Sequence, residues 1–322
     1  MIPIRDTIAT RHRPVVNLSL IGINVVVFLV QMTQGPEADR FVYIYGLVPA
    51  RFSDPRIAAY FSPLQQLFSL LSFMFLHGGF WHILGNMWSL YIFGDNVEDR
   101  LGHPRYLAFY LMCGLASGIS HLLLNWHSTI PTIGASGAIA GVMGAYFILF
   151  PTAKVLTLIP IIFIPWFVEI PAAFFLGLWF LLQFISAAGS HGAVSGIAWW
   201  AHIGGFVFGI VFLKLFQLLP STGIAEKLGP VTEKTTTRHL QVIHPRGSGD
   251  TPDLHGFIEL SAREALAGTR KLVNIPWGFY TRMLKVTVPA GTAEGSSLRL
   301  KGMGRQLTGG ARGDLILKVQ IR

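Results

Sequence analysis

The sequence predicts an all-α membrane domain with six transmembrane helices, followed by a small soluble β domain of sandwich-like type. Of the 322 residues, 52% are hydrophobic and only 13% are charged, far from the composition of an ordinary soluble protein. Six apolar runs precede residue 220, and short runs of alternating apolar and polar residues follow residue 253. Long apolar runs are typical of membrane spans, and short alternating runs are typical of strands.

The first predicted span, residues 15–32, contains no charged side chain. About 20 apolar residues cross a bilayer, so this run is long enough for one span. Residues 155–169 are apolar but interrupted by prolines and Glu169, so we expect a loop or a shallow segment there. The other spans are predicted at residues 67–94, 106–124, 138–150 (the core of the fourth), from about 170 to 184, and 199–219.

The chain divides into three predicted regions: a membrane domain at 1–217, a linker at 218–252 and a β domain at 253–322. The linker mixes Gly, Pro, Thr and charged residues. The β domain has five strand-like runs separated by Pro and Gly, a pattern that favours antiparallel β structure. These runs are residues 256–260, 270–275, 281–288, 297–301 and 314–321.

The distribution of Lys and Arg predicts the orientation of the spans. Cytoplasmic loops are enriched in these residues, and placing both termini in the cytoplasm leaves positive charge outside only in the long first loop. No cleavable signal peptide is expected, because the first thirteen residues are polar and no small-residue cleavage pattern follows the first span. Cys113 is the only cysteine, which excludes a disulfide framework. We expect an integral protein of a bacterial inner (plasma) membrane.

The segment Gly134-Ala135-Ser136-Gly137 joins a polar loop to the fourth span. A serine at a helix N-terminus lies beside unpaired backbone N–H groups and the positive end of the helix dipole. Both features suit a nucleophile whose attack creates an oxyanion. Taken alone, the motif is more often a plain capping serine. On the same helix, Gly137, Gly141 and Gly144 line one face.

Histidine and asparagine are costly inside a membrane and usually face the interior of the bundle. His202 shares a helix face with Gly205 and Gly209, a small-residue pair that allows close helix packing. If that face meets the glycines after Ser136, the serine and the histidine come within hydrogen-bond reach, as nucleophile activation requires. No Asp or Glu is placed to orient His202, so the sequence predicts a dyad.

In the second span, His82 and Asn86 lie on one helix face. Hydrogen bonding between helices is the alternative interpretation of this pair. His77 precedes His82 by five residues, so on one continuous helix it would point about 140° away.

Three motifs in order resemble the rhomboid intramembrane serine proteases: His77-x4-His82-x3-Asn86, Gly134-Ala-Ser136-Gly137 and Ala201-His202-Ile-Gly-Gly205. The segment Gly94-x3-Glu98-x3-Gly102 is also similar to that family. The resemblance covers about residues 15–217. It implies that Ser136 is the nucleophile and His202 its base, and that His82 and Asn86 help to hold the oxyanion with the backbone N–H of the serine. It implies no cofactor and no metal.

Two features depart from this family. The first loop lacks the Trp-Arg pair that many members have, which weakens the predicted anchoring of this loop. Ala140 stands where the family often has an aromatic residue against which the base histidine packs. The second departure leaves the orientation of His202 open. Neither removes a reacting group.

The tail resembles the C-terminal client-binding domain of DnaJ-type co-chaperones, on the segments 260–269, 288–291, 298–304 and 313–315. The J-domain signature His-Pro-Asp and the cysteine-rich zinc region are absent from the sequence. The resemblance therefore implies weak binding of apolar peptides at most. A solubilising or regulatory appendage is an equally open interpretation.

The leading hypothesis is an intramembrane serine endopeptidase that cleaves transmembrane segments of membrane proteins near the outer face. The alternative is a catalytically silent rhomboid-like protein that binds membrane clients, and the presence of Ser136 and His202 favours the first. A transporter is disfavoured, because the spans contain few ionisable groups and show no obvious repeat. Nucleic-acid binding is also disfavoured. The basic tail intersperses its charges with apolar residues, and an anionic membrane surface can attract it. The predicted partners are thus membrane-protein substrates and the lipid bilayer.

Overall fold

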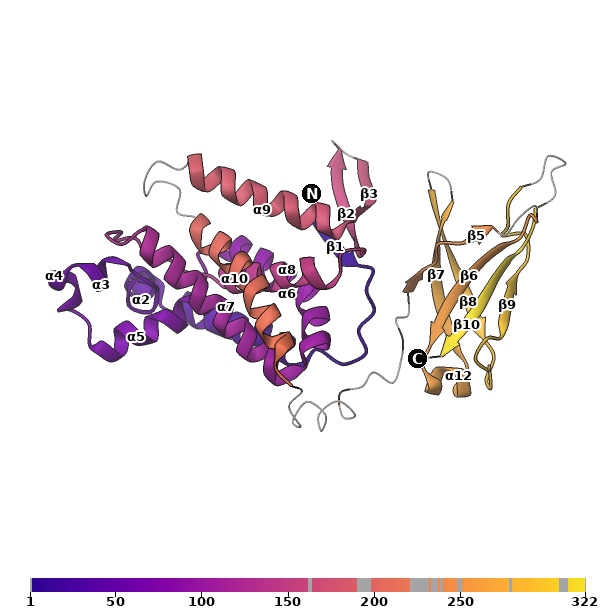
Figure 1. Ribbon diagram of the computed structural model, residues 1–322, viewed down its shortest axis with the longest axis horizontal. Helices are drawn as coiled ribbons and strands as arrows, with labels where there is room; N and C mark the ends of the chain where they lie inside the picture. Colours follow the sequence, from indigo (N-terminus) through magenta and orange to yellow (C-terminus); the bar gives the residue numbers. More distant parts are fainter. Residues whose placement is uncertain are drawn as a thin grey trace. The chain divides into compact units, whose positions relative to one another are not determined.

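The computed structural model describes residues 2–161, 164–189, 198–220, 232, 237, 240–247, 251–277, 280–306 and 312–321. The chain forms two compact units, Met1–Thr232 and Glu233–Arg322. The first is mainly helical and the second is built mainly of strands (Figure 1). Strands β4 and β5 of the second unit lie within residues 218–252, the range that the sequence analysis assigned to a linker.

The long helices of the first unit correspond to the predicted spans. They are α1 (Val15–Met32), α6 (Phe80–Leu101), α7 (His103–Leu124), α8 (Ser136–Leu149), α9 (Ala172–Gly189) and α10 (Trp199–Leu218). Among the described residues, α1, α7, α9 and α10 are each long and apolar enough to cross a membrane. Helix α8 has only 14 residues, and those from Gly137 to Tyr146 are all buried. The protein is therefore an integral membrane protein with at least four candidate spans.

The second predicted span is not one straight helix. Helix α5 (Pro63–Ser72) continues into η2 (Phe73–Phe75) and is followed by α6 after a bend of 77°. The break contains Gly79, whose φ of +151° lies in a region that other residues rarely adopt. Counting this bent pair as one span gives five candidates.

The predicted loop at residues 155–169 is wrong, because the chain forms a β-hairpin there. Strands β2 (Lys154–Ile161) and β3 (Ile164–Pro171) pair antiparallel, and β1 (Ile2–Asp6) pairs with β2. The buried carboxylate of Asp6 accepts hydrogen bonds from Asn96 (2.6 Å) and the Tyr146 hydroxyl (2.8 Å). These bonds fix the N-terminal strand against α6 and α8.

The motif Gly94-x3-Glu98-x3-Gly102 joins α6 to the start of α1. The Glu98 carboxylate accepts hydrogen bonds from the backbone N–H groups of Val16 (2.9 Å) and Asn17 (2.7 Å), which satisfies donors at the N-terminus of α1. A Cβ on Gly94 would lie 2.1 Å from Oδ1 of Asn17, so only glycine fits this approach. This motif therefore has a structural role.

The first loop contains η1 (Gly35–Glu37) and the short helices α2 (Ala38–Tyr45), α3 (Ala50–Ser53) and α4 (Pro55–Ala58). The buried Arg51 of α3 joins α2 to the segment that follows α4. Its guanidinium lies 3.7 Å from the ring centroid of Phe61 and donates a hydrogen bond to the carbonyl of Ile44 (2.9 Å). Burial lowers the pKa of Arg51 to about 10, so it is a cation at neutral pH. The first loop has no Trp-Arg pair, and the contacts of Arg51 hold parts of this loop together instead.

The second unit has two sheets that share one apolar core. One has the strand order β5-β6-β10-β9 and the other β4-β7-β8. Buried residues of both, including Ile258, Val273, Val286 and Leu317, form one cluster. The bounds are β4 (Leu240–Val242), β5 (Arg246–Gly247), β6 (Leu254–Leu260), α12 (Ala262–Ala267), β7 (Thr269–Trp277), β8 (Tyr280–Val288), β9 (Ser297–Leu300) and β10 (Leu315–Ile321).

All five predicted strand-like runs are strands. The predicted antiparallel pairing holds for β9–β10, β5–β6 and β7–β8 but not for every pair. The pairs β6–β10 and β4–β7 are parallel. Parallel partners need a long connection, which the alternation of residues within a single run does not reveal.

Candidate active site

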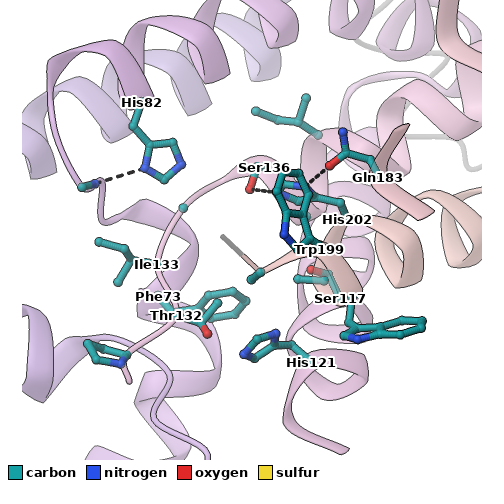
Figure 2. Close-up of a pocket in the computed structure, with 18 of the residues that line it drawn as sticks. Phe73, His82, Ser117, His121, Thr132, Ile133, Ser136, Gln183, Trp199 and His202 are labelled. Carbon is teal, nitrogen blue, oxygen red and sulfur yellow. Dashed lines mark hydrogen bonds between the residues drawn. The ribbon is translucent and has the colours of Figure 1, made fainter. Parts of the chain in front are cut away.

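Ser136 is the first residue of α8, directly after a loop that turns at Gly134. No side chain caps this helix at Ala135, and the first N–H groups of a helix have no partner within it. The serine hydroxyl therefore lies beside the N-terminal N–H groups of α8 and the positive end of the helix dipole. It points into a cavity (Figure 2).

Helices α8 and α10 pack through their glycines, and this predicted contact of two small-residue faces is confirmed. A Cβ on Gly205 would lie 2.0 Å from the carbonyl oxygen of Gly137, and one on Gly209 would lie 2.2 Å from that of Gly141. Because the backbones approach so closely, the side chains at the start of both helices meet. Nε2 of His202 lies 2.7 Å from Oγ of Ser136.

The His202 ring is held by residues of α9 and by its own helix. Its Nδ1 lies 2.8 Å from Oε1 of Gln183, a residue that is 7% exposed. The ring centroids of Trp179 and Trp199 lie 5.9 Å and 6.2 Å from that of His202. Aromatic support thus comes from α9 and α10 and does not require an aromatic residue in place of Ala140.

His82 faces the same space as the serine. Its Nδ1 accepts a hydrogen bond from the backbone N–H of Gly78 (3.2 Å), so the ring proton of the neutral imidazole is on Nε2. Gly134, with a φ of +126°, lies next to this nitrogen. A Cβ there would be 2.9 Å from Nε2 of His82 and 3.6 Å from Oγ of Ser136. Glycine therefore keeps open the space that the imidazole N–H and the serine hydroxyl share.

Asn86 lies one turn after His82 on α6 and lines the same cavity. It is 8% exposed, and its Nδ2 makes no hydrogen bond to any residue that the structure describes. An unsatisfied buried donor costs about 1–3 kcal/mol. The alternative role in helix–helix bonding is thus not seen for this amide group, which is available to a bound ligand.

His77 does not lie where the sequence analysis expected it. It precedes α6, so the angle of about 140° for one continuous helix does not apply to it. Its ring stacks edge-on against that of His82, with centroids 5.2 Å apart. Because the chain bends before α6, a helical projection does not apply to this residue. His77 therefore packs against the ring of His82.

The cavity that contains these groups has a volume of about 1220 Å³. Helices α6, α7, α8, α9 and α10 contribute to its wall, with the segment 126–134. Ser117 and His121, one turn apart on α7, also line it, as Figure 2 shows. The site combines a hydroxyl, an adjacent imidazole and further donors, which is the set that acyl transfer requires.

Comparison with known protein families identifies both units. Residues 64–217 match the Rhomboid domain family, and this range includes Ser136, His202, His82 and Asn86. The chain contains a rhomboid domain. Residues 239–322 match the DnaJ C terminal domain family.

Relatives with rhomboid names match parts of the chain. Rhomboid protein 1, mitochondrial, of Saccharomyces cerevisiae is 28% identical over 206 residues, which cover 60% of this chain and 51% of that protein. RHOMBOID-like protein 5 of Arabidopsis thaliana is 38% identical over 76 residues, 24% of this chain and 25% of that protein. RHOMBOID-like protein 1 of the same plant is 28% identical over 159 residues, 49% of this chain and 37% of that protein. The chain spans about half or less of the length of these relatives.

Sequence reasoning missed Gln183, the hydrogen-bond partner of His202. It is the only amide in a helix that is otherwise apolar except for Ser186, and a polar residue inside a membrane span is a signal of an interior role. Its partner could not be inferred, because that depends on how α9 is rotated against α10. Among the described residues, no group of three or more His, Cys, Asp or Glu is arranged to bind a metal ion.

Proposed function

We propose that the rhomboid domain is an intramembrane serine endopeptidase that cleaves transmembrane segments of other membrane proteins. The observation that carries this proposal is the 2.7 Å contact between Oγ of Ser136 and Nε2 of His202, inside a cavity of a membrane domain. A serine hydroxyl becomes a competent nucleophile only when an adjacent base can take its proton. Ser136 is the nucleophile and His202 the base.

In the proposed mechanism, Oγ of Ser136 attacks the carbonyl carbon of the scissile peptide while its proton moves to Nε2 of His202. The negative charge that develops on the carbonyl oxygen is stabilised by the Nε2–H of His82, the amide of Asn86 and the backbone N–H of Ser136. His202 then gives its proton to the leaving amine, and an ester to Ser136 remains. Water, deprotonated by His202, attacks this ester. His202 then returns the proton to Oγ of Ser136 as the second product leaves.

We further propose the membrane arrangement predicted from the sequence. Six spans result if α5 and α6 count as one and the buried helix α8 as another. The Lys and Arg distribution supports cytoplasmic termini, with Ser136 near the outer face of a bacterial plasma membrane. Cleavage is then expected in the outer half of the substrate helix. Gly or Pro near the cleavage site should help, because a helical peptide has its carbonyls bonded.

A second candidate function, binding of membrane clients without cleavage, is favoured by the match of residues 239–322 to the DnaJ C terminal domain family. In this proposal the β domain binds exposed apolar peptide weakly, and the rhomboid domain holds the membrane segment of the client. The two functions differ in one observable, the appearance of cleavage products.

The test is incubation of the purified full-length protein with a labelled single-span substrate in detergent. Ser136→Ala and His202→Ala should each abolish cleavage, and the double variant should be no worse than either, because the two groups act as a unit. Ser89→Ala is the matched control. Its hydroxyl also lines the cavity but donates a hydrogen bond to the carbonyl of Gly85. Full activity of a folded Ser136→Ala protein would exclude the protease, and cuts mapped by mass spectrometry to the cytoplasmic half would exclude the orientation.

A further inference from the structure

Gln183 is a polar residue of the active-site cavity that contacts the proposed base directly and that the proposed mechanism has not used. Helix α9 is apolar, and the neighbours Leu182 and Phe184 are each about half exposed on its outer surface. Gln183 is 7% exposed, so it points inward from the same helix. Its carboxamide oxygen lies 2.8 Å from Nδ1 of His202 (Figure 2).

The chemistry of this contact determines which nitrogen of His202 carries the proton. A carboxamide oxygen can only accept a hydrogen bond, so the proton of the neutral imidazole is on Nδ1. The lone pair of Nε2 is then directed at the Ser136 hydroxyl 2.7 Å away, as a general base requires. In the opposite tautomer Nε2 would carry a proton and could not accept one from the serine.

We infer that Gln183 is a positioning residue that holds His202 in its base-competent tautomer, and that the dyad works as a chain of three groups, Ser136, His202 and Gln183. This inference rests on the proposed protease function. A neutral amide suits the site better than a carboxylate, because an ionised group inside a membrane is costly unless it is paired. The amide fixes the tautomer without introducing that charge.

The same geometry makes the base dependent on helix α9. Trp179 precedes Gln183 by four residues and so shares its helix face. Its ring lies 5.9 Å from that of His202. One face of α9 therefore supplies both a hydrogen bond and a packing surface to the base, whereas the nucleophile lies on α8. A displacement of α9 that breaks the Gln183 contact would leave His202 near Ser136 but with no fixed tautomer.

The test compares Gln183→Met, which has similar length but no amide acceptor, with Gln183→Glu, which keeps an oxygen at the same place. Leu182→Met is the control for a methionine on the outer surface of α9. In full-length protein, kcat of Gln183→Met should fall on the order of 10- to 100-fold with KM within about twofold, since the loss of a tautomer-fixing group in a serine protease costs up to about 10⁴. At alkaline pH, Gln183→Glu should recover most of the rate, and Leu182→Met should match wild type.

The second readout does not require a substrate. Nitrogen-15 NMR of histidine-labelled full-length protein, with the His202 signals assigned by comparison with His202→Ala, reports which ring nitrogen is protonated. We expect the Nδ1–H form in wild type and a mixture in Gln183→Met. A wild-type kcat in Gln183→Met, or an Nε2–H form in wild type, would overturn the role of Gln183. Absence of cleavage by wild type would instead overturn the proposed function, and the tautomer measurement would still test Gln183.

Discussion

Gly205 on α10 and Gly137 on α8 meet backbone to backbone, so that a Cβ on Gly205 would lie 2.0 Å from the Gly137 carbonyl oxygen. No side-chain movement can relieve such a contact, because the neighbouring atom belongs to the main chain. The two helices would have to separate. The distance between Ser136 and His202 thus depends on the absence of one methyl group three residues after the histidine.

Gly205→Ala should therefore destabilise the membrane domain by about 1–3 kcal/mol, the usual cost of overpacking, and abolish cleavage. Denaturant titration and labelling of Ser136 by a fluorophosphonate would measure the two effects. Gly22→Ala on α1 is the matched control, because nothing lies within 4 Å of a Cβ at that position. Wild-type labelling in Gly205→Ala would contradict the close packing of α8 and α10.

Asn86→Ala should lower kcat on the order of 10²–10³-fold with little change in KM, because an oxyanion donor acts mainly in the transition state. His82→Ala should behave similarly. Steady-state kinetics on a single-span substrate would separate the two constants. If only apparent affinity changed, the amide of Asn86 would have a structural or substrate-binding role in place of the proposed one.

Acid should destabilise the second unit through the buried pair Glu264–Lys271. Burial raises the pKa of Glu264, but hydrogen bonds from Lys271, Ser261 and Thr237 lower it more, and the net shift is downward. A carboxylate with a lowered folded-state pKa contributes its full stability above the unfolded value, about 4.3, and loses it as the pH falls through the folded value. Unfolding of residues 233–322 should thus become easier as the pH falls below about 5.

Glu264→Gln should remove much of this acid sensitivity. It should also destabilise the domain at neutral pH by about 3 kcal/mol, because Lys271 is left buried without its charge partner. Glu294→Gln, a change at an exposed glutamate, is the control. Chemical denaturation between pH 3 and 8 would measure both effects. An unchanged pH profile in Glu264→Gln would mean that the Glu264–Lys271 pair is not the source of the acid sensitivity.

Truncation after Thr232 should leave cleavage of a generic substrate in detergent within about twofold of wild type, because the lining of the cavity comes from the first unit. A cut after Gly223 should cost about 1 kcal/mol of stability. It removes Thr232, whose hydroxyl lies 2.9 Å from Nε2 of His103 and whose carbonyl accepts a hydrogen bond from the N–H of Arg13. Thermal unfolding would measure the stability of the two truncated proteins, and cleavage of a single-span substrate would measure their activity. Loss of activity in the longer form would mean that the β domain takes part in catalysis.

The positions of the helices could be predicted from hydropathy because a bilayer demands long apolar runs. Helix α1 has the predicted bounds 15–32, and α10 ends one residue before the predicted end. The bend before α6 was missed, since a window average does not register the backbone angle of a single glycine. The hairpin β2–β3 was missed for a related reason. Its strands are apolar and contain prolines, so they resemble a shallow membrane segment, and their partner β1 lies far away in the sequence.

The candidate site was predictable in part, because glycine spacing on two helices indicated which faces could meet. The contact of His202 with Gln183 was not, since it depends on the rotation of a third helix. The stacking of His77 on His82 was also missed, because the two residues do not lie on one continuous helix.

The pairing of β1 with β2 has a consequence for biosynthesis. Ile2 pairs with Leu158, so the N-terminal strand has no partner until on the order of 150 further residues have been made. At 5–20 residues per second, this is about 10–30 s. During that interval the helices between β1 and β2 are made, and β1 has not yet formed its pairing with β2. The sheet can close only after α8 is in place, so its closure marks the completion of the helix that carries Ser136.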